Sequence, residues 1–370
     1  MADSGESIGA TPSHSIRTLP PRPSDSIMPM ASAEPPHTVA PNSVSRVMRL
    51  VLIALLPAVA IHVAFFGAGL LVQLSLGMAT ALLTEAIALH LRKQPIRRFL
   101  TDGSAIITAV LLAMCLPPTA PWWLIVSGTA FAILIAKHLY GGLGSNPFNP
   151  AMVGYAVLLV SFPAQLTRWL PPHVGASVGL DFGNTLYAIF AGALPPQLTW
   201  DAVTSPTPLD AVRTGLNMGL TMQEVQTNAV IGLLGGRGWA WVNLAVLAGG
   251  IWLMALKIIR WHIPVALLLG LAVPAAMMHA VDPGSYPSAL FHMTAGASML
   301  GAFFIATDPI SAATSERGRL VYGAGIGLIT YTIRTWGGYP DGIAFAVLLM
   351  NLAVPLIDRY TVPRIYGRAN

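Results

Sequence analysis

Long runs of apolar residues recur along the chain from Val47 onward, and they set the first expectation for the fold. A helix needs about 20 residues to cross a hydrocarbon layer that is about 30 Å thick. Ten runs approach that length, at roughly 47–66, 68–90, 103–118, 121–137, 150–166, 238–257, 263–281, 289–306, 319–335 and 341–357. The third, fifth and tenth runs are short or interrupted by proline, which makes their ends the least defined. The pattern predicts an all-α polytopic membrane protein with about ten transmembrane helices.

The segments outside these runs divide the chain into five parts. Residues 1–45 are rich in Ser, Pro and Ala, and they lack the basic start and apolar core of a secretory signal, so they predict a flexible tail. Residues 167–237 form the one long loop between predicted spans. We therefore expect the N-terminal tail, a five-helix half at 46–166, the loop, a second five-helix half at 238–360 and a short tail at 361–370.

A weak internal similarity links the two halves. Residues 141–144, GGLG, precede the fifth span, and residues 337–340, GGYP, precede the tenth. Because five is odd, two consecutive five-helix halves must have opposite orientations in the membrane. This arrangement is an inverted repeat, which commonly frames a binding site near the membrane midplane. The alternative is that two unrelated helices share glycine-rich entrances, and the sequence leaves both interpretations open.

The composition supports the membrane assignment. Apolar residues make up 54% of the chain, Asp, Glu, Lys and Arg only 9%, and the mean hydropathy is +0.65. Soluble domains carry roughly 25% charged residues, so these values exclude a soluble enzyme, a disordered scaffold and a collagen-like fibre. The single cysteine, Cys115, excludes a disulfide framework, a cysteine-rich zinc module and a cysteine-ligated iron–sulfur cluster within the chain.

The basic residues are distributed unequally between the two sides of the predicted topology. The chain carries 20 Lys and Arg against 15 Asp and Glu. With the N-terminus in the cytoplasm, only Arg168, Arg213, Arg237 and Arg334 fall on the outer side, and the other sixteen fall inside. Cytoplasmic loops are enriched in basic residues. We therefore expect both termini in the cytoplasm and the long loop outside, in the periplasm of a Gram-negative cell. Topology then explains the net charge of +5, and no nucleic-acid partner is expected.

Few ionisable residues lie inside the predicted spans. Glu85 is in the second span, and it reads either as a carboxylate on a proton or cation pathway or as one paired with Arg92 or Lys93 near the cytoplasmic end. Three histidines lie near the outer ends of spans: His62, His279 and His292. No two histidines have the spacing of metal ligands, so we expect no protein-bound metal.

The connection between the fourth and fifth spans is unusually polar for its position. Its glycines and prolines free backbone N–H groups, and it carries the amides of Asn146 and Asn149. Non-helical backbone at membrane depth persists only where protein or a ligand satisfies it. A planar ligand with an imide edge, such as an isoalloxazine, would hydrogen-bond to these amides. The alternative is that the two Asn side chains cap their own turns.

The sharpest feature of the outer loop surrounds Thr207. Pro206 and Pro208 predict an extended, exposed backbone at this threonine. A hydroxyl held in this way is able to accept a covalent group from a modifying enzyme. On composition alone, however, the segment is also an ordinary turn.

Four stretches carry a resemblance that spans residues 43–367. They are GGLGSNPFNPAM at 141–152, TDP at 307–309, IRTWGGYP at 333–340 and LLMNLAVPLIDRY at 348–360. The chain resembles the family of D subunits of the Rnf complex, an ion-translocating electron-transport complex. That family is related to the B subunits of the sodium-pumping NADH:quinone reductase.

The resemblance implies a covalent flavin on the outer loop. The family carries FMN bound through its phosphate to a threonine, in a phosphoester bond that a flavin transferase installs. In the family motif, an acidic residue precedes a Ser or Thr and then the acceptor, and Asp201, Thr204 and Thr207 match it. Ser205 replaces the usual Gly and Pro206 the usual Ala. The proline stiffens the segment that the transferase must take up.

A second segment fits the same spacing. Residues 308–314 place Thr314 at the acceptor position and keep Ala before it. Thr314 lies on the side of Arg317 and Arg319, which the charge distribution assigns to the cytoplasm. The family's transferase works on the outer face, so we expect Thr207 to be the acceptor.

The resemblance also implies the wider role. The chain would be a subunit of a translocase-class enzyme in the bacterial inner membrane, without catalytic residues of its own. It would relay electrons between reduced ferredoxin and NAD, coupled to Na⁺ or H⁺ movement. A non-covalent riboflavin, held by Asn146 and Asn149, would help electrons to cross the bilayer. Other membrane subunits, an outer flavoprotein subunit, the flavin transferase and membrane lipid are the implied partners.

Two alternatives remain at this point. In the first, the chain is the quinone-reductase subunit, with the same chemistry and a different electron acceptor. In the second, it is a channel or secondary transporter without a cofactor, since inverted five-helix repeats also build those proteins. Glu85 would then be the leading residue of the transport pathway.

Overall fold

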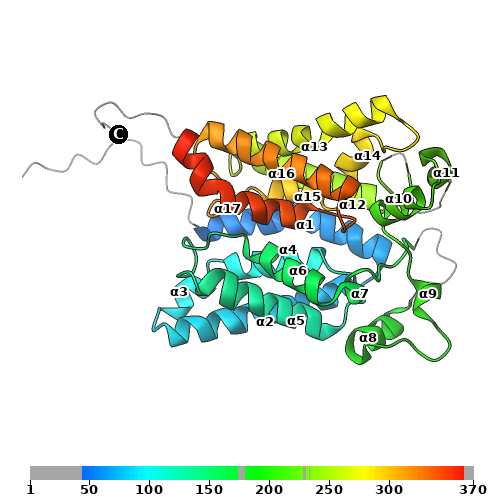
Figure 1. The fold of residues 1–370 in the computed structure, drawn as a ribbon. Helices are drawn as coiled ribbons and strands as arrows, with labels where there is room; N and C mark the ends of the chain where they lie inside the picture. The colour runs from blue at the N-terminus through cyan, green and yellow to red at the C-terminus, as the bar shows by residue number, and fades with distance from the viewer. Residues whose placement is uncertain (1–43, 174–179, 228–230, 233, 362–370) are drawn as a thin grey trace, which may run out of the picture. The chain divides into compact units, whose positions relative to one another are not determined.

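The computed structural model describes residues 44–173, 180–227, 231–232 and 234–361. Within these ranges every regular element is helical, and the described residues of the loop and of the helices belong to one compact unit (Figure 1). Each of the ten predicted spans contains helix, although the fifth and eighth are interrupted. The predicted tails at 1–45 and 361–370 lie almost entirely outside the described residues.

The first half follows the expected order of spans. Its helices are α1 (Val44–Phe66), α2 (Gly69–Leu91), α3 (Ile96–Leu100), α4 (Ser104–Met114), α5 (Trp122–Phe131), η1 (Ala132–His138), α6 (Pro150–Ser161) and α7 (Pro163–Leu166). The predicted fourth span is therefore an α-helix that continues as the π-helix η1. The fifth span is interrupted, because Phe162 leaves the helical region and Pro163 starts a new short helix.

The second half begins after the outer loop. Its helices are α12 (Trp239–Ala255), α13 (His262–Val281), α14 (Ala289–Thr294), α15 (Ser298–Leu300), η2 (Gly301–Ile305), α16 (Glu316–Trp336) and α17 (Ile343–Thr361). The prediction of a continuous eighth span at 289–306 is wrong. The chain is extended at Ala295 and turns through the left-handed region at Gly296, with a φ of +59°, which divides the span into α14 and α15.

The helices carry the signs of a lipid-facing bundle. By length and composition, α1, α2, α13 and α17 are able to span a membrane, and four shorter apolar helices accompany them: 104–114, 122–138, 150–161 and 239–255. Large apolar side chains on the outside of the bundle are exposed, such as Leu56 of α1 at 60% and Leu352 of α17 at 69%. A water-soluble protein rarely exposes so many of them together. The chain is a multi-pass membrane protein.

The two halves repeat the same pattern of packing. In the first half α2 packs against α4 and α5, and α5 packs against α6. In the second half α13 packs against α14 and α16, and α16 packs against α17. The corresponding first helices, α1 and α12, pack against each other in opposite directions, because His62 near the end of α1 lies beside Trp239 at the start of α12. This correspondence supports the predicted inverted repeat.

The described part of the long loop carries four short helices and gathers at one end of the bundle (Figure 1). Its described helices are α8 (Phe182–Ala191), α9 (Trp200–Val203), α10 (Pro208–Asn217) and α11 (Met222–Gln226). The opposite end of the bundle holds α3 and the start of α1. The loop thus sits over one end of the helices, and this position creates the first of two cavities.

Candidate functional site

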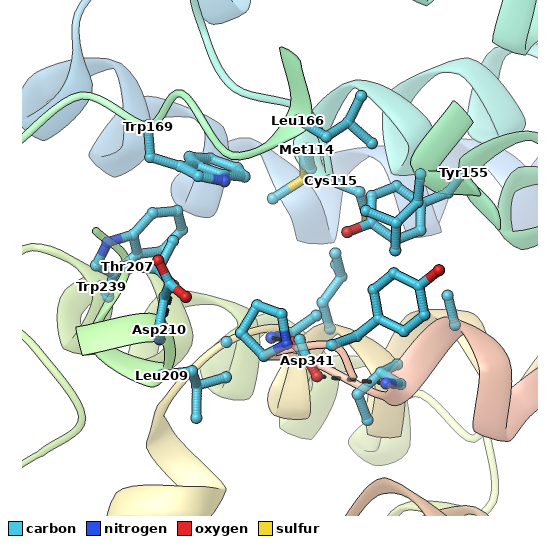
Figure 2. Close-up of a pocket in the computed structure, with 18 of the residues that line it drawn as sticks. Met114, Cys115, Tyr155, Leu166, Trp169, Thr207, Leu209, Asp210, Trp239 and Asp341 are labelled. Carbon is cyan, nitrogen blue, oxygen red and sulfur yellow. Dashed lines mark hydrogen bonds between the residues drawn. The ribbon is translucent and has the colours of Figure 1, made fainter. Parts of the chain in front are cut away.

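The first cavity has a volume of about 420 Å³ and lies where the outer loop meets the bundle (Figure 2). Its walls come from the ends of α1, α4 and α6, from the starts of α10, α12 and α17, and from the segment before α15. Most of the lining side chains are apolar or aromatic, among them Trp169, Trp239 and Tyr155. This size and character are typical of a site for a small organic ligand.

Thr207 lies at the edge of this cavity and caps helix α10. Its backbone is extended, with φ −66° and ψ 159°, as the flanking prolines predict. Its hydroxyl accepts a hydrogen bond from the N–H of Asp210 at 3.3 Å. The predicted exposure holds only in part, since Pro206 is exposed, whereas Thr207 is half-buried and Pro208 is the buried first residue of α10. The loop folds onto the bundle, which the local sequence does not reveal.

The other residues of the acceptor motif shape the approach to Thr207 without lining the cavity. Asp201 is exposed in the first turn of α9. The hydroxyl of Thr204 donates to the carbonyl of Trp200 at 2.8 Å, and the N–H of Ser205 donates to the carbonyl of Trp169 at 2.9 Å. These bonds fix the segment of chain that leads into Thr207.

Two charged side chains of α10 face the same cavity as Thr207. Burial raises the pKa of the Asp210 carboxyl, and the nearby Arg213 guanidinium opposes that rise. The first turn of a helix carries a partial positive charge, which favours an anionic group at this point. The end of the cavity near Thr207 is therefore suited to an anion, although the rest of the cavity is apolar.

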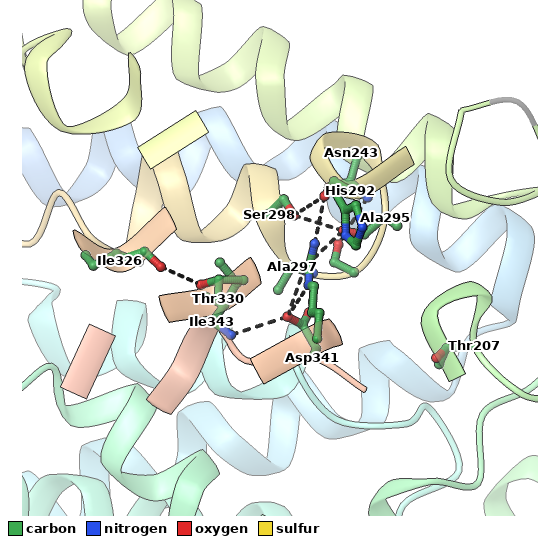
Figure 3. A network of polar contacts seen from close by, with 12 residues as sticks. Thr207, Asn243, His292, Ala295, Ala297, Ser298, Ile326, Thr330, Asp341 and Ile343 are labelled. Atoms are coloured by element: carbon green, nitrogen blue, oxygen red, sulfur yellow. Dashed lines mark hydrogen bonds and ion pairs between the residues drawn. The ribbon is translucent and has the colours of Figure 1, made fainter. Parts of the chain in front are cut away.

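The broken eighth span forms part of the cavity wall and depends on a polar network (Figure 3). A helix break inside a membrane protein leaves carbonyls that need donors. Arg334 donates from Nη1 to the carbonyl of His292 at 2.7 Å. Asn243 donates from Nδ2 to the carbonyls of Thr294 at 2.9 Å and Gly296 at 3.2 Å. Helices α16 and α12 thus satisfy the backbone that the break exposes.

Asp341 completes this network from the start of α17. Its Oδ1 accepts from Nη2 of Arg334 at 2.9 Å, and its Oδ2 accepts from the N–H of Ala297 at 2.8 Å. The network also touches α10, because a side chain on Gly296 would collide with both Asp341 and Leu209. Sequence reasoning used Arg334 only as an outer-side charge and gave Asp341 no role, since their partners are distant in the chain.

A second cavity of about 340 Å³ lies at the opposite end of the bundle. Its walls come from the start of α1, from α4, from the end of α12 and from the segment after η2. Asn146, Asn149, Lys137 and Asp308 line it among mostly apolar residues. The structure therefore brings both asparagines singled out in the sequence to one cavity.

The two asparagines have different environments. The Oδ1 of Asn149 accepts from the N–H of Met152 at 3.3 Å and caps α6, while its Nδ2 donates to the carbonyl of Ile305 at 3.1 Å. The Nδ2 of Asn146 donates to the carbonyl of Phe148 at 3.0 Å. The buried Oδ1 of Asn146, however, has no partner among the described residues. Asn149 follows the capping interpretation, and Asn146 keeps a free acceptor.

Glu85 is buried and paired, but its partner differs from the expected one. Lys137, at the end of η1, donates to both carboxylate oxygens of Glu85 at 2.7 and 2.8 Å, and to the hydroxyl of Ser104 at 2.8 Å. The predicted partners were Arg92 and Lys93. The π-helical turn of η1 directs Lys137 into the bundle, and its side chain is only 2% exposed. Of the two interpretations of Glu85, the structure favours the ion pair.

A partition built from residues of α6 and η2 separates the two cavities. Met152 of α6 and Ile305 of η2 line the first cavity, while the preceding residues, Ala151 and Phe304, line the second. The hydrogen bond from Asn149 to the carbonyl of Ile305 crosses this partition. Two ligands in the cavities would therefore be separated by side chains of α6 and η2.

Thr314, the competing acceptor, is exposed and lines neither cavity. Its hydroxyl donates to Oδ2 of Asp358 at 2.9 Å, and its N–H donates to Oδ1 at 3.0 Å. It follows η2 on the side of the second cavity, at the end of the bundle away from Thr207. The two threonines thus differ in their surroundings although they share a sequence pattern.

The three histidines singled out in the sequence, His62, His279 and His292, have different surroundings. No group of three or more His, Cys, Asp or Glu in the described ranges is placed to hold a metal ion. The Nδ1 of His279 lies 2.7 Å from the carbonyl of Tyr286. His62 and His292 are buried, at 1% and 4% exposure. Of these two, His62 lines the first cavity.

Comparison with known proteins covers nearly the whole chain. The model of the NQR2, RnfD, RnfE family matches residues 31–367. The D subunit of the ion-translocating oxidoreductase complex of Escherichia fergusonii is 51% identical over 343 residues, which are 90% of this chain and 97% of that protein. The D subunits of the same complex from Yersinia pseudotuberculosis and Cronobacter sakazakii are 51% and 50% identical, over 91% and 90% of this chain and 98% of each relative.

Proposed function

Because the chain belongs to the NQR2, RnfD, RnfE family and is an RnfD-type subunit of an ion-translocating oxidoreductase complex, we propose that it carries FMN on Thr207 through a phosphoester bond. The observation that carries this proposal is the position of Thr207, whose hydroxyl stands at the edge of a cavity of about 420 Å³ with aromatic walls. FMN bound there supplies reversible electron transfer, because the phosphoester leaves its isoalloxazine ring intact.

The residues around Thr207 suit the phosphate. An ester at the N-cap of α10 places its negative charge at the positive end of the helix dipole. Arg213 adds a full positive charge to the same cavity. An ionised Asp210 carboxylate would repel the phosphate. Burial raises the pKa of this carboxyl, which favours its neutral form and weakens the repulsion. The chain thus provides the anion site, and the apolar walls of the cavity suit the flavin ring.

We infer that the second cavity takes a non-covalent flavin, riboflavin by the family resemblance. The free, buried Oδ1 of Asn146 supports this, since an unpaired buried acceptor costs about 1–3 kcal/mol unless a ligand satisfies it. Asn149 contributes less directly, because both ends of its amide are engaged by the protein. Its bond to Ile305 stiffens the wall instead.

The arrangement of the two cavities supports an electron relay across the membrane. They lie toward opposite ends of the bundle and are divided by Ala151 and Met152 of α6 and by Phe304 and Ile305 of η2. Two flavins in them would shorten the step between the faces of the bilayer. In the complex we propose that the relay connects reduced ferredoxin and NAD and is coupled to movement of Na⁺ or H⁺.

The topology and the partners follow from the same proposal. The distribution of basic residues assigns both termini to the cytoplasm and Thr207 to the periplasmic side of the bacterial inner membrane. A flavin transferase on that side would modify Thr207. The implied partners within the complex are the other membrane subunits and an outer flavoprotein subunit, with lipid around the bundle.

The relatives help to order the alternatives. The matched proteins are named as D subunits of an ion-translocating oxidoreductase complex, which favours that complex over the quinone reductase. The same names favour an oxidoreductase over a channel or secondary transporter. The ion pair of Glu85 with Lys137 also argues against a free pathway carboxylate.

In-gel flavin fluorescence after denaturing electrophoresis tests the proposal directly. The flavin transferase is co-expressed, and wild type, Thr207→Val and Thr314→Val are compared at equal protein. We expect the band to disappear only in Thr207→Val, because valine keeps the size of threonine and lacks the hydroxyl. A band lost only in Thr314→Val would contradict both the site and the topology. No band in any lane, with the transferase active on another substrate, would contradict covalent flavin binding.

A further inference from the structure

A buried histidine in the first cavity has no hydrogen-bond partner. His62, one turn before the end of α1, is 1% exposed, and neither of its ring nitrogens has a partner in the described part of the chain. It lines the same cavity as Thr207. A buried polar atom without a partner costs about 1–3 kcal/mol. A side chain that carries this cost at the wall of a cavity indicates a ligand with polar groups.

Aromatic rings surround His62. Its ring centroid lies 4.9 Å from that of Phe66 and 5.9 Å from that of Trp239. Trp239 meets Trp169 at 5.0 Å, nearly edge to face. Figure 2 shows both tryptophans on the side of the cavity where Thr207 lies. These rings provide an apolar enclosure, and His62 is its buried polar member with both nitrogens free.

We propose that His62 hydrogen-bonds the ring system of the flavin on Thr207, inside the enclosure formed by Trp169 and Trp239. The inference rests on the proposed function and adds to it the side chain that positions the ring. A neutral imidazole offers one donor and one acceptor. The polar edge of an isoalloxazine carries both donors and acceptors, and its benzenoid end is apolar. The aromatic walls of the cavity suit the apolar end of the ring system, and the imidazole of His62 suits its polar edge.

The phosphate and the ring would then be held by different parts of the chain. Thr207 and Arg213 belong to the outer loop, whereas His62 belongs to the first membrane helix. A flavin attached at Thr207 is tethered but free to swing unless a second group fixes its ring. His62 is therefore a positioning residue, and its removal is expected to change the environment of the flavin and not its attachment.

The test uses His62→Phe in the complete complex, because phenylalanine keeps an aromatic ring and removes the hydrogen bond. His62→Gln retains a donor and an acceptor. His292→Phe is the matched control, since His292 is also buried with both nitrogens unpartnered but lines neither cavity. Three readouts are taken on each: in-gel fluorescence, the visible absorption spectrum of the covalent flavin, and its midpoint potential by redox titration.

We expect all three variants to keep the covalent flavin. His62→Phe should shift the absorption spectrum and change the equilibrium constant for flavin reduction about tenfold, which is about 30 mV for a two-electron couple. His62→Gln and His292→Phe should stay close to wild type. Should His62→Phe fail to assemble, His62→Leu is measured in its place.

Three outcomes overturn the inference and can be told apart. If His62→Phe retains the covalent flavin with the spectrum and potential of wild type, His62 does not contact the ring, and the proposed function stands. A shift of the same size in His292→Phe would also mean that the effect is not specific to the cavity. If wild type carries no covalent flavin, the proposed function fails and the inference fails with it.

Discussion

At the scale of single residues, three side chains carry the account: Thr207 lines the first cavity, Glu85 forms a buried ion pair, and His62 has no hydrogen-bond partner among the described residues. The prolines beside Thr207 fix its extended backbone, and the sequence predicted this conformation because a proline restricts only its immediate neighbours. The sequence did not predict the ion-pair partner of Glu85. Arg92 and Lys93 were the nearest cations along the chain, whereas Lys137, the true partner, follows 52 residues later. The sequence also did not predict that the ring nitrogens of His62 lack hydrogen-bond partners, since this depends on how α1, α12 and the loop pack.

The Glu85–Lys137 pair gives a prediction at this scale. Lys137→Met leaves a carboxylate buried without its cation, and breaking a buried ion pair in this way costs about 3–5 kcal/mol. We expect a clearly lower melting temperature of the purified protein in detergent. The double variant Glu85→Gln, Lys137→Met should recover most of the loss, because it removes both charges. Equal melting temperatures for Lys137→Met and wild type would contradict the pairing.

At the scale of elements, the sequence located the helices and the proline interruption of the fifth span, but not the break in the eighth. The run at 289–306 predicted one span, yet the chain breaks between α14 and α15. The break is stable because Arg334 and Asn243 supply donors to its carbonyls from other helices. A pattern of apolar residues cannot contain that information. The break matters for function, since it forms a wall of the first cavity and meets α10 at Leu209.

Gly296 offers a test of that wall. Gly296→Ala places a Cβ against Asp341 and Leu209 and in a left-handed conformation, with φ +59°. The matched control is Gly192→Ala, because Gly192 has a φ of +69° and open space around the added atom. The control measures the backbone strain alone, roughly 1 kcal/mol. We expect Gly296→Ala to lower the melting temperature well below that of Gly192→Ala, and to reduce covalent flavin by loosening α10. Equal melting temperatures would argue against the close packing.

For the whole molecule, the sequence predicted an all-α membrane protein with several membrane-spanning helices, and the structure added the cavities. Hydropathy is sufficient to find apolar helices, so each of the ten predicted spans contains helix. Cavities depend on how helices from both halves fit together, and no local pattern encodes that fit. The lining of the two cavities shows which residues would contact each of the proposed flavins. In the proposed account, Thr207 holds a flavin at the outer end and Asn146 faces a second flavin toward the inner end.

The most direct test of this account is peptide mass spectrometry of the protein purified after co-expression with the flavin transferase. Trypsin cuts after Arg168 and Arg213 and after Arg260 and Arg317, which separates Thr207 from Thr314. We predict that the 169–213 peptide carries the mass of one FMN less one water, with fragment ions that assign it to Thr207. The same mass on the 261–317 peptide, or unmodified peptides with an active transferase, would contradict the account.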